Sequence, residues 1–364
     1  MKGIFTLTSN THFRGIADIN SGRGFVRVAG YTRSSGDVPL NSNQIRSAAL
    51  RRGDEIEGER EGNSLRITTI NGLSPDVARH RPNFDDLTPV YPDERFRLED
   101  GSDSPTARII DLIAPVGKGA RGLIVAPPKA GKTTILKTIA QAIATTNPDV
   151  HLMMVLVGER PEEVTDLSRS VQGEVIYSTF DQPADDHIRV AELAIEHAKR
   201  LVELGRDVVV LLDSLTRLGR AYNLAAPSNG KTLSGGLAAS ALQYPRHFLG
   251  AARNIEEGGS LTILSTTLVD TGSRLDDSLF EEFKGTGNME LRLRRDLAEK
   301  RIFPAIDAGA SGTRRDDLLM GNAEHGAVTK VRRAISGLEP QQALELLLDK
   351  TSQSNAAFLR QVAA

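Results

Sequence analysis

The chain has 364 residues, of which 39% are hydrophobic and 25% charged, as is typical of a folded globular protein. It contains no cysteine, which excludes disulfides, cysteine-ligated metal centres and thiol catalysis. The formal net charge of −2 gives no global attraction for nucleic acid, so such a partner would need a local basic surface. No apolar run approaches the ~20 residues that span a bilayer, and the N-terminus has no secretory pattern. We therefore expect a cytoplasmic protein without a membrane partner.

The N-terminal residues 1–82 are predicted to form a small all-β domain. They carry 12 Lys and Arg against 8 Asp and Glu, a local balance of +4. Short strand-like runs separated by Gly and Asn are typical of a small sandwich or barrel, and a short helix is expected within Ser42–Leu50. The predicted strands are Gly3–Thr8, Gly15–Ile19, Phe25–Gly30, Asp54–Glu61 and Leu65–Ile70.

Residues 83–106 are rich in proline and are predicted to be an irregular connector. From 107 to 364, apolar strand-like runs alternate with helical stretches such as Thr133–Ala144 and His187–Leu204. This alternation predicts an α/β domain with a mostly parallel sheet and helices on both faces, followed by C-terminal helices. The predicted strands are Gly122–Ala126, Leu152–Val157, Val208–Leu212 and Leu261–Thr266, and the C-terminal helices lie within Gln342–Leu348 and Asn355–Val362.

A phosphate-binding loop is the sharpest local signal, because Ala126–Thr133 follows a strand and opens a helix. Backbone N–H groups at a helix N-terminus face an anion, a lysine reaches the outer phosphates and a hydroxyl ligates Mg²⁺. Lys132 and Thr133 are predicted to take the last two roles. Ala126 stands where the first glycine of the motif normally lies. The predicted ATP-binding residues are Pro127, Pro128, Lys129, Ala130, Gly131, Lys132, Thr133, Thr134 and Arg160.

Two other strand ends carry carboxylates. Asp213 ends the run Val208–Leu212, and ligands of parallel sheets bind at the carboxyl ends of strands, so we predict that it holds Mg²⁺ together with Thr133. A helix cap is the alternative role for Asp213. Glu159 follows another strand and can orient the water that attacks ATP. The alternative is that Glu159 is one of three acids in the first turn of a helix beginning near Pro161. These features together predict an Mg²⁺-dependent NTPase.

Four stretches together resemble the bacterial transcription termination factor Rho family: Ala126–Thr133, Gly158–Val164, Leu211–Asn223 and Glu281–Leu291. The resemblance is dense from about 107 to 320 and looser from 1 to 100. The phosphate loop alone would fit any RecA-like ATPase, rotary ATP synthase subunits included, whereas Glu281–Leu291 favours Rho.

The resemblance implies a RecA-like P-loop ATPase domain preceded by an OB-fold or cold-shock-like barrel. It implies a homohexameric ring that uses ATP and Mg²⁺, pulls single-stranded RNA through its centre and releases transcripts from RNA polymerase, with elongation factors as further partners. It also implies catalytic roles for Lys132, Glu159 and Arg160. Arg314 and Arg301 are expected to reach the neighbouring subunit's nucleotide, although each could otherwise be a surface charge.

RNA contacts are predicted in the barrel and in two loops. Phe25 and Arg27 are two residues apart, on one face of a strand, where the aromatic ring can stack on a base and the arginine can bind phosphate. Phe25 could instead belong to the core. The loops 227–236 and 270–274 match the family's central-pore loops and would otherwise be surface turns. The predicted RNA-binding residues are Arg23, Phe25, Arg27, Tyr31, Lys231, Gly235, Arg274 and Lys284.

The sequence departs from the family pattern at several places. Arg23 stands where the family usually has an aromatic residue, the region Asn63–Arg66 lacks one, and Gly158 replaces a common acidic residue beside Glu159. The family's N-terminal helical segment has no counterpart before the predicted barrel. Gly158 and the altered barrel motivate an alternative reading, an RNA-binding regulatory protein whose ATP site cycles weakly. A rotary-type ATPase subunit shares the fold but gives no reason for Phe25 and Arg27.

Overall fold

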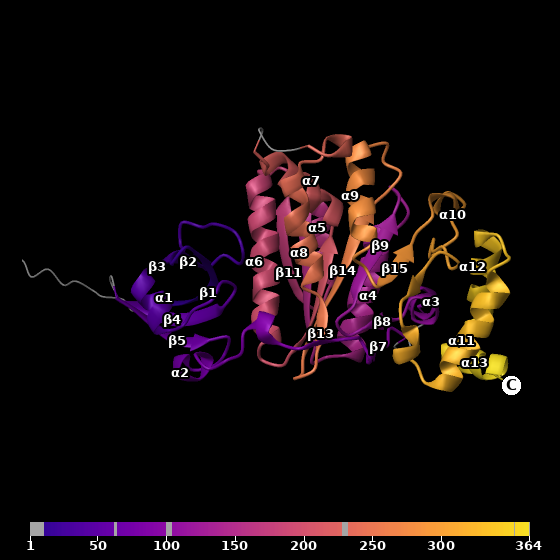
Figure 1. Cartoon of the computed structure of the whole chain (residues 1–364), viewed down its shortest axis with the longest axis horizontal. Helices are drawn as coiled ribbons and strands as arrows, with labels where there is room; N and C mark the ends of the chain where they lie inside the picture. Colours follow the sequence, from indigo (N-terminus) through magenta and orange to yellow (C-terminus); the bar gives the residue numbers. More distant parts are fainter. Residues whose placement is uncertain (1–10, 62–63, 100–103, 228–231, 353, 364) are drawn as a thin grey trace, which may run out of the picture. The chain divides into compact units, whose positions relative to one another are not determined.

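The computed structural model describes residues 11–61, 64–99, 104–227, 232–352 and 354–363, arranged as two compact units (Figure 1). Unit 1 comprises the N-terminal residues to Leu87 together with Arg189–Leu204, and unit 2 comprises Thr88–Ile188 and Gly205 onward. The domain bounds 1–82, 83–106 and 107–364 remain a prediction.

Unit 1 is built on an antiparallel sheet of five strands in the order β3-β2-β1-β4-β5, packed on a core that includes Val26, Ile56 and Ile70. Its elements are β1 (Thr11–Asn20), β2 (Arg23–Arg27), β3 (Val38–Leu40), α1 (Ser42–Ser47), β4 (Glu55–Glu61), β5 (Ser64–Ile70), α2 (Pro75–Ala78) and η1 (Phe84–Asp86). The helix expected within Ser42–Leu50 is confirmed as α1.

Strand β2 differs from its predicted bounds because a two-residue hairpin precedes it. Ser21 and Gly22 both have positive φ, of 49° and 77°, and Asn20 pairs with Arg23, so the strand begins directly after the turn. Strand β3 was not predicted, since Pro39 breaks the strand pattern. Its place at the edge of the sheet is where a proline is tolerated. The predicted strand Gly3–Thr8 lies outside the described residues.

Unit 2 confirms the predicted α/β architecture. Its main sheet has the strand order β11-β10-β12-β14-β9-β15-β16, in which β9, β10, β11, β12, β14 and β15 run parallel. Strand β13 pairs with β14, and β6 pairs with β13. The strands are β6 (Pro89–Val90), β7 (Arg95–Phe96), β8 (Val116–Gly117), β9 (Arg121–Ala126), β10 (His151–Glu159), β11 (Glu174–Thr179), β12 (Asp207–Asp213), β13 (Arg253–Ile255), β14 (Ser260–Leu268), β15 (Met289–Arg292) and β16 (Gly312–Thr313).

The helices cover both faces of this sheet, because its central strands are apolar on both sides. The helices of unit 2 are α3 (Pro105–Ile113), α4 (Lys132–Thr146), α5 (Pro161–Ser170), α7 (Leu215–Ala225), η2 (Ser234–Gly236), η3 (Ala239–Leu242), α8 (Gln243–Gly250), α9 (Arg274–Lys284), α10 (Arg295–Glu299), η4 (Asp316–Leu318), α11 (Asn322–Ile335), α12 (Pro340–Lys350) and α13 (Asn355–Ala363). Helix α6 (Ala184–Val202) begins in unit 2, and from Arg189 onward it belongs to unit 1.

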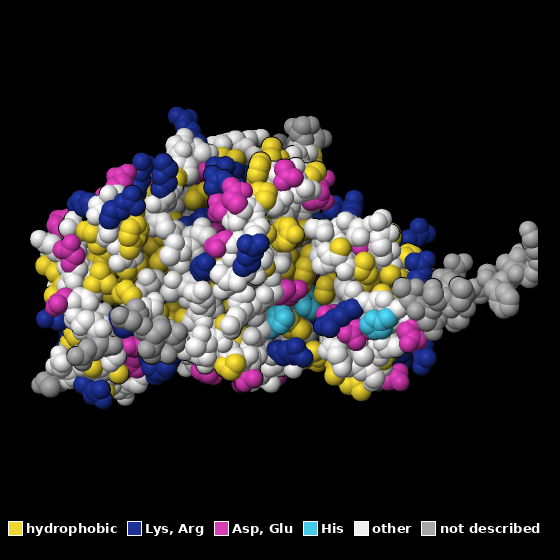
Figure 2. Space-filling view, turned by 180° about the vertical axis from the view of Figure 1, so that it is seen from behind, with side chains coloured by type: hydrophobic (Ala, Val, Ile, Leu, Met, Phe, Trp, Pro, Cys, Tyr) yellow, Lys and Arg dark blue, Asp and Glu magenta, His cyan; other side chains and the backbone are white. Residues whose placement is uncertain are grey.

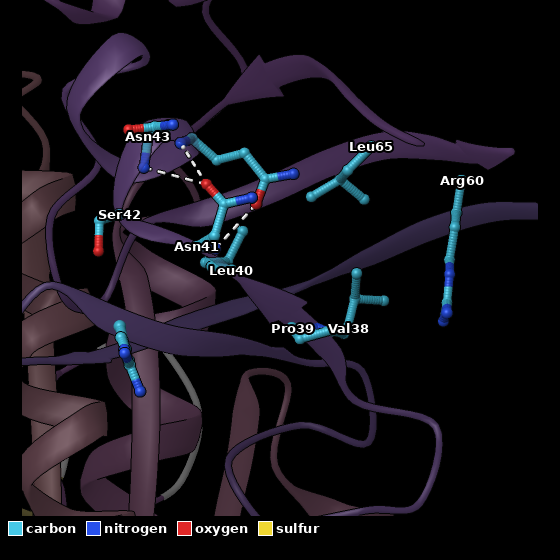
Figure 3. A pocket seen from close by; sticks show the side chains of 10 residues that line it. Val38, Pro39, Leu40, Asn41, Ser42, Asn43, Arg60 and Leu65 are labelled. Atoms are coloured by element: carbon cyan, nitrogen blue, oxygen red, sulfur yellow. Dashed lines mark hydrogen bonds between the residues drawn. The ribbon is translucent and has the colours of Figure 1, made fainter. Parts of the chain in front are cut away.

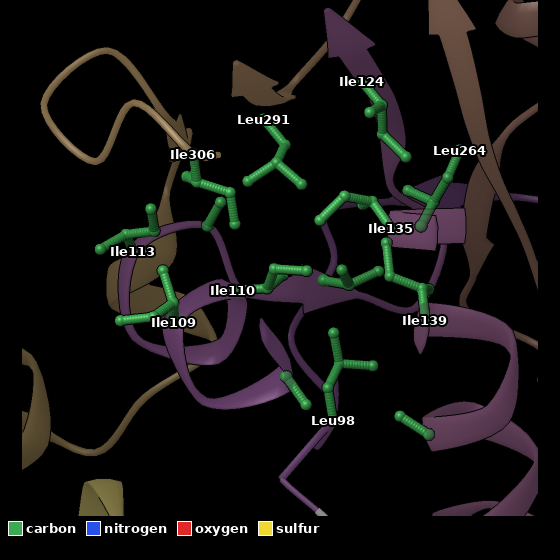
Figure 4. Packing of buried hydrophobic residues seen from close by; sticks show 14 of the residues in the cluster. Leu98, Ile109, Ile110, Ile113, Ile124, Ile135, Ile139, Leu264, Leu291 and Ile306 are labelled. Carbon is green, nitrogen blue, oxygen red and sulfur yellow. The ribbon is translucent and has the colours of Figure 1, made fainter. Parts of the chain in front are cut away.

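The main core of unit 2 anchors the elements that carry the phosphate loop. Ile124 of β9, Ile135 and Ile139 of α4, and Leu264 of β14 are each at most 3% exposed and converge with the side chains of α3 (Figure 4). Strand β9 and helix α4 are therefore fixed on both sides of the loop, so the site rests on rigid elements.

Candidate nucleotide and RNA sites

The phosphate loop spans the five residues between the end of β9 at Ala126 and the start of α4 at Lys132. Lys129 and Gly131 have φ values of 68° and 92°, and Gly131 is the N-cap of α4 without a side-chain cap. The first N–H groups of α4 thus have no intrahelical or side-chain acceptor, which suits them to an anion. Thr133 and Thr134 lie in this first turn, the former half-buried and the latter exposed.

Three predicted residues meet beside this loop. The Lys132 ammonium donates to Glu159 Oε1 at 3.2 Å and to Asp213 Oδ1. Glu159 ends β10 with 2% exposure and Asp213 ends β12 fully buried, so both carboxylates lie at the carboxyl edge of the sheet. Burial, and then repulsion from Asp213, raises the pKa of Glu159, while Lys132 and Arg217 oppose this shift.

The residues of this cluster fit a hydrated divalent cation. Asp213 Oδ1 accepts a hydrogen bond from Thr266 Oγ1 at 2.8 Å, whereas its buried Oδ2 has no partner among the described residues. Thr133 brings a hydroxyl oxygen at the loop, and hard oxygen donors of these kinds suit Mg²⁺. An orphaned carboxylate oxygen next to a phosphate loop is therefore consistent with the predicted metal role of Asp213.

Sequence reasoning missed Arg217, which joins the cluster, whereas the predicted Arg160 lies apart from it. Arg217, in the first turn of α7, places its Nε 3.2 Å from Glu159 Oε1 and donates from Nη1 to the Gly158 carbonyl. Arg160 instead points to solvent with 62% side-chain exposure and pairs with Glu163 at 2.6 Å. The available signal was that Arg217 follows Asp213 by four residues, one helical turn beyond the strand end.

Arg314 lies away from the phosphate loop of its own chain. It follows β16, whose Thr313 is opposite Met289, and Met289 is opposite Gly122 near the start of β9. The loop begins beyond the other end of β9, about 13 Å farther along the strand at ~3.3 Å per residue. Arg314 therefore does not join the cluster of Lys132, Glu159 and Asp213 within one chain.

A basic pocket of ≈ 320 Å³ surrounds Arg314 and includes Lys284 and Arg332. Lys284 was predicted to bind RNA together with Arg274, but the two residues lie at opposite ends of α9, about 15 Å apart at ~1.5 Å per residue. Arg301 is exposed, has φ 61° and follows α10, apart from this pocket.

The two predicted pore loops meet in unit 2. A Cβ on Gly235 would lie 2.6 Å from the backbone oxygen of Arg274, so only glycine allows this approach, and its φ of 72° also favours glycine. Arg274 is exposed at the start of α9. The structure thus brings Gly235 and Arg274 together, whereas Lys231 lies outside the described residues.

An open pocket of ≈ 580 Å³ in unit 1 contains the predicted Arg23. Asn41 and Gln44 form a reciprocal capping box at the start of α1, which fixes the polar end of the pocket, and Arg60 lies at the other end (Figure 3). The lining residues are Arg23, Val38, Pro39, Leu40, Asn41, Ser42, Asn43, Gln44, Arg60 and Leu65.

The predicted RNA-binding residues Phe25, Arg27 and Tyr31 differ in exposure. Phe25 is 44% exposed and pairs across the sheet with Pro39, a pocket residue, so it is not a core residue. Arg27 is only 6% exposed and forms ion pairs with Asp18 at 2.5 Å and Asp37 at 2.6 Å, with its guanidinium 5.1 Å from the Phe25 ring. Tyr31 is 5% exposed. Burial leaves Arg27 and Tyr31 little surface for RNA, which departs from their predicted roles.

Lys and Arg side chains are interspersed with Asp and Glu on the face shown in Figure 2, in keeping with the net charge of −2. No helix in the described part of the chain is long and apolar enough to cross a membrane.

The fold and the phosphate loop define a P-loop nucleotide-binding protein with an additional N-terminal β-sheet domain. Residues 106–313 match the ATP synthase alpha/beta family, nucleotide-binding domain, and residues 13–76 match the Rho termination factor, RNA-binding domain. Two solved structures share the fold. One is a prototypical type III secretion ATPase with a TM-score of 0.64 and 24% identity, covering 77% of this chain and 88% of that one. The other is the assembled ATPase EscN from enteropathogenic E. coli, with a TM-score of 0.65 and 20% identity, covering 98% of both chains.

The chain belongs to the transcription termination factor Rho family. It is 57% identical to the factor of Streptosporangium roseum over 351 residues, covering 96% of this chain and 91% of that protein. It is 60% identical to the factor of Streptomyces lividans over 361 residues and 55% identical to that of Mycobacterium tuberculosis over 364 residues, with 96% of this chain covered each time. It spans 51% of the former protein's length and 60% of the latter's.

Proposed function

We propose that this protein is an RNA-stimulated ATPase that moves along single-stranded RNA and releases transcripts from RNA polymerase. The observation that carries the ATPase is the convergence of Lys132, Glu159 and Asp213 at the carboxyl edge of the sheet, beside a phosphate loop. Membership of the Rho family supports the work that hydrolysis drives.

In the proposed mechanism the phosphates of ATP lie against the N-terminus of α4. Lys132 then transfers its hydrogen bonds from the two carboxylates to the outer phosphates, which frees Glu159 to accept a hydrogen bond from the attacking water. Asp213 and Thr133 would hold Mg²⁺, which neutralises phosphate charge when bound. Arg217, already paired with Glu159, keeps that side chain directed at the site.

RNA capture is proposed for the pocket of unit 1. Phe25 offers an exposed ring for stacking, and Arg23 and Arg60 line a pocket large enough for a base. The ion pairs of Arg27 suit it to supporting the Phe25 ring from beneath rather than to binding phosphate. In the predicted pore loops, Arg274, which lies beside Gly235, is proposed to contact RNA.

Arg314 is proposed to act on the nucleotide of a neighbouring subunit in a homohexameric ring. Its distance from its own phosphate loop supports this role, because a guanidinium supplied across an interface can stabilise transition-state charge. Mixed rings provide the test. Lys132→Ala and Arg314→Ala subunits should each be inactive alone, but their mixture should show a single-turnover burst. Absence of a burst in confirmed mixed rings would leave Arg301 as the candidate.

Steady-state ATP hydrolysis with and without a pyrimidine-rich RNA tests the function as a whole. We expect brisk turnover that rises when RNA is added. A protein that forms rings but hydrolyses no ATP with any RNA contradicts the motor and favours the regulatory RNA-binding alternative.

A further inference from the structure

The segment that carries Arg314 is held by a second arginine on another element. Arg332 of α11 donates from Nη1 to the Ser311 carbonyl at 3.2 Å and from Nη2 to the Ile113 carbonyl. Ile113 is the last residue of α3, so the guanidinium joins the C-terminus of that helix to the strand preceding Arg314. A Cβ on Gly312 would lie 3.5 Å from Arg332 Nη2, which shows how closely the guanidinium packs on β16.

The Arg332 guanidinium forms no ion pair with any described carboxylate, although Asp316 lies near enough to stabilise its charge. Its buried Nε has no hydrogen-bond partner among the described residues. A partly buried guanidinium without an anion is unfavourable unless it satisfies other groups. Here it satisfies two carbonyls, one of them at a helix C-terminus, where a cation is favoured.

Two further hydrogen bonds hold the Ser311–Arg314 segment, one of them close to the end of α3. Thr313 Oγ1 donates to the Pro115 carbonyl at 2.7 Å, two residues after α3, and the Arg314 N–H donates to the Asn288 carbonyl at 2.8 Å. The backbone that leads into Arg314 is thus held in place, while the Arg314 side chain is exposed in the basic pocket. Such an arrangement fixes where the guanidinium is presented.

We propose that Arg332 is a positioning residue for Arg314: it clamps the Ser311–Arg314 segment to the end of α3, so that Arg314 reaches the neighbouring subunit's nucleotide in register. The inference rests on the proposed role of Arg314 in trans. A misplacement of about 1 Å of a catalytic group can reduce the rate about 100-fold, so loss of the clamp should have an effect of that order. Arg332→Lys keeps the charge and can reach one carbonyl, and we expect it to restore about a tenth of the wild-type rate or more.

The experiment tests whether Arg332 serves the nucleotide site of its own subunit or that of the neighbouring subunit. Arg332→Met subunits retain their own phosphate loop, so in mixed rings with Lys132→Ala subunits they can use an intact Arg314 from the neighbour. We expect little hydrolysis from Arg332→Met alone and a single-turnover burst in the mixture. The matched control is Arg333→Met, the adjacent exposed arginine of α11, which should hydrolyse ATP at the wild-type rate.

The outcomes are separable from those of the proposed function. If the Arg314→Ala and Lys132→Ala mixture shows a burst but the Arg332→Met mixture does not, Arg332 serves its own subunit's fold or site and the inference is wrong. Near-wild-type hydrolysis by Arg332→Met also overturns it. If the Arg314→Ala mixture itself fails, the trans role fails, and the positioning role fails with it. Should Arg332→Met not form rings by mass measurement, Arg332→Lys carries the test through amplitude: its mixture with Lys132→Ala must give a larger single-turnover burst per intact phosphate loop than Arg332→Lys alone, and no increase overturns the inference.

Discussion

Replacing Lys132 with methionine probes both the chemistry of the nucleotide site and the stability of the nucleotide-free protein. Among the described residues, Lys132 is the only cation paired with Asp213, whereas Glu159 also pairs with Arg217. Removing one partner of a buried ion pair destabilises a protein by about 3–5 kcal/mol. We expect the low end, about 3 kcal/mol, because Arg217 remains on Glu159 and the Lys132 side chain keeps some exposure.

The loss should depend on pH with a defined sign. Burial and Asp213 already raise the pKa of Glu159, and Lys132 opposes the shift, so the variant raises that pKa further. A carboxyl whose folded pKa exceeds its unfolded value binds more protons in the folded state. Stability then falls as pH rises from the ordinary value of about 4.3 through the raised folded pKa. The deficit of Lys132→Met should therefore be larger at about pH 8 than at about pH 5.

Urea unfolding at both pH values measures the deficit, and Lys137→Met is the control. Lys137 lies on the same helix but forms an exposed pair with Asp166, which contributes at most about 1 kcal/mol. In parallel, hydrolysis by Lys132→Met should be abolished while RNA affinity is kept, because Phe25 and the pocket belong to unit 1. Equal loss of RNA affinity and hydrolysis, or a pH-independent deficit, would refute this reasoning.

Three further changes follow from the sites. Phe25→Ala should weaken binding of single-stranded RNA by about 1–3 kcal/mol in fluorescence anisotropy, whereas Tyr91→Ala, an exposed aromatic of unit 2, should not. Lys284→Ala should lower the rate of ATP hydrolysis at saturating RNA but keep the increase in rate that RNA causes. Arg274→Ala should lose that increase. Identical phenotypes would contradict the separation of the two ends of α9. Burial raises the pKa of Asp111 to about 6, so stability should fall by about 3 kcal/mol as pH rises from ~3 to ~7. Asp111→Asn should remove this slope in urea titrations, and an unchanged slope would exclude Asp111 as its source.

The nucleotide site was predictable where its residues follow directly from local sequence signals. The phosphate loop lies between a strand and a helix that are both visible in the sequence, and Glu159 and Asp213 end apolar strands that a parallel sheet must align. The sheet brings their carboxyl ends together, so the meeting of Lys132 with both acids follows from topology.

The remaining features depend on partners distant in sequence. Arg27 shares a strand face with the exposed Phe25, but Asp18 and Asp37 bury its charge, and no pattern within β2 reveals them. Lys284 lies on the helix that begins with Arg274, yet the length of α9 carries it to the pocket of Arg314. Arg217 was missed because its contact with Glu159 arises between α7 and β10.

The absence of a side chain at Gly158 affects the electrostatics of Glu159, the residue proposed to orient the attacking water. It has φ 66° at a bulge in β10, and a Cβ there would lie 3.4 Å from Arg217 Cδ and 3.7 Å from His187 Nε2. An aspartate at this position is therefore placed to compete with Glu159 for Arg217.

We expect Gly158→Asp to destabilise the protein by about 1 kcal/mol through backbone strain, since Asp tolerates positive φ comparatively well. Gly158→Asn has nearly the same shape and strain without the charge, so comparing the two variants isolates electrostatics. A new carboxylate raises the pKa of Glu159 both by repulsion and by drawing Arg217 away. The low-pH limb of the pH–rate profile of ATP hydrolysis, where the rate rises as Glu159 loses its proton, should therefore lie at higher pH in Gly158→Asp than in Gly158→Asn, with rates that differ several-fold. Superimposable profiles would show that Arg217 does not control the ionisation of Glu159, whereas a large gain over a nearly inactive wild type would mark the native site as a weakly cycling one.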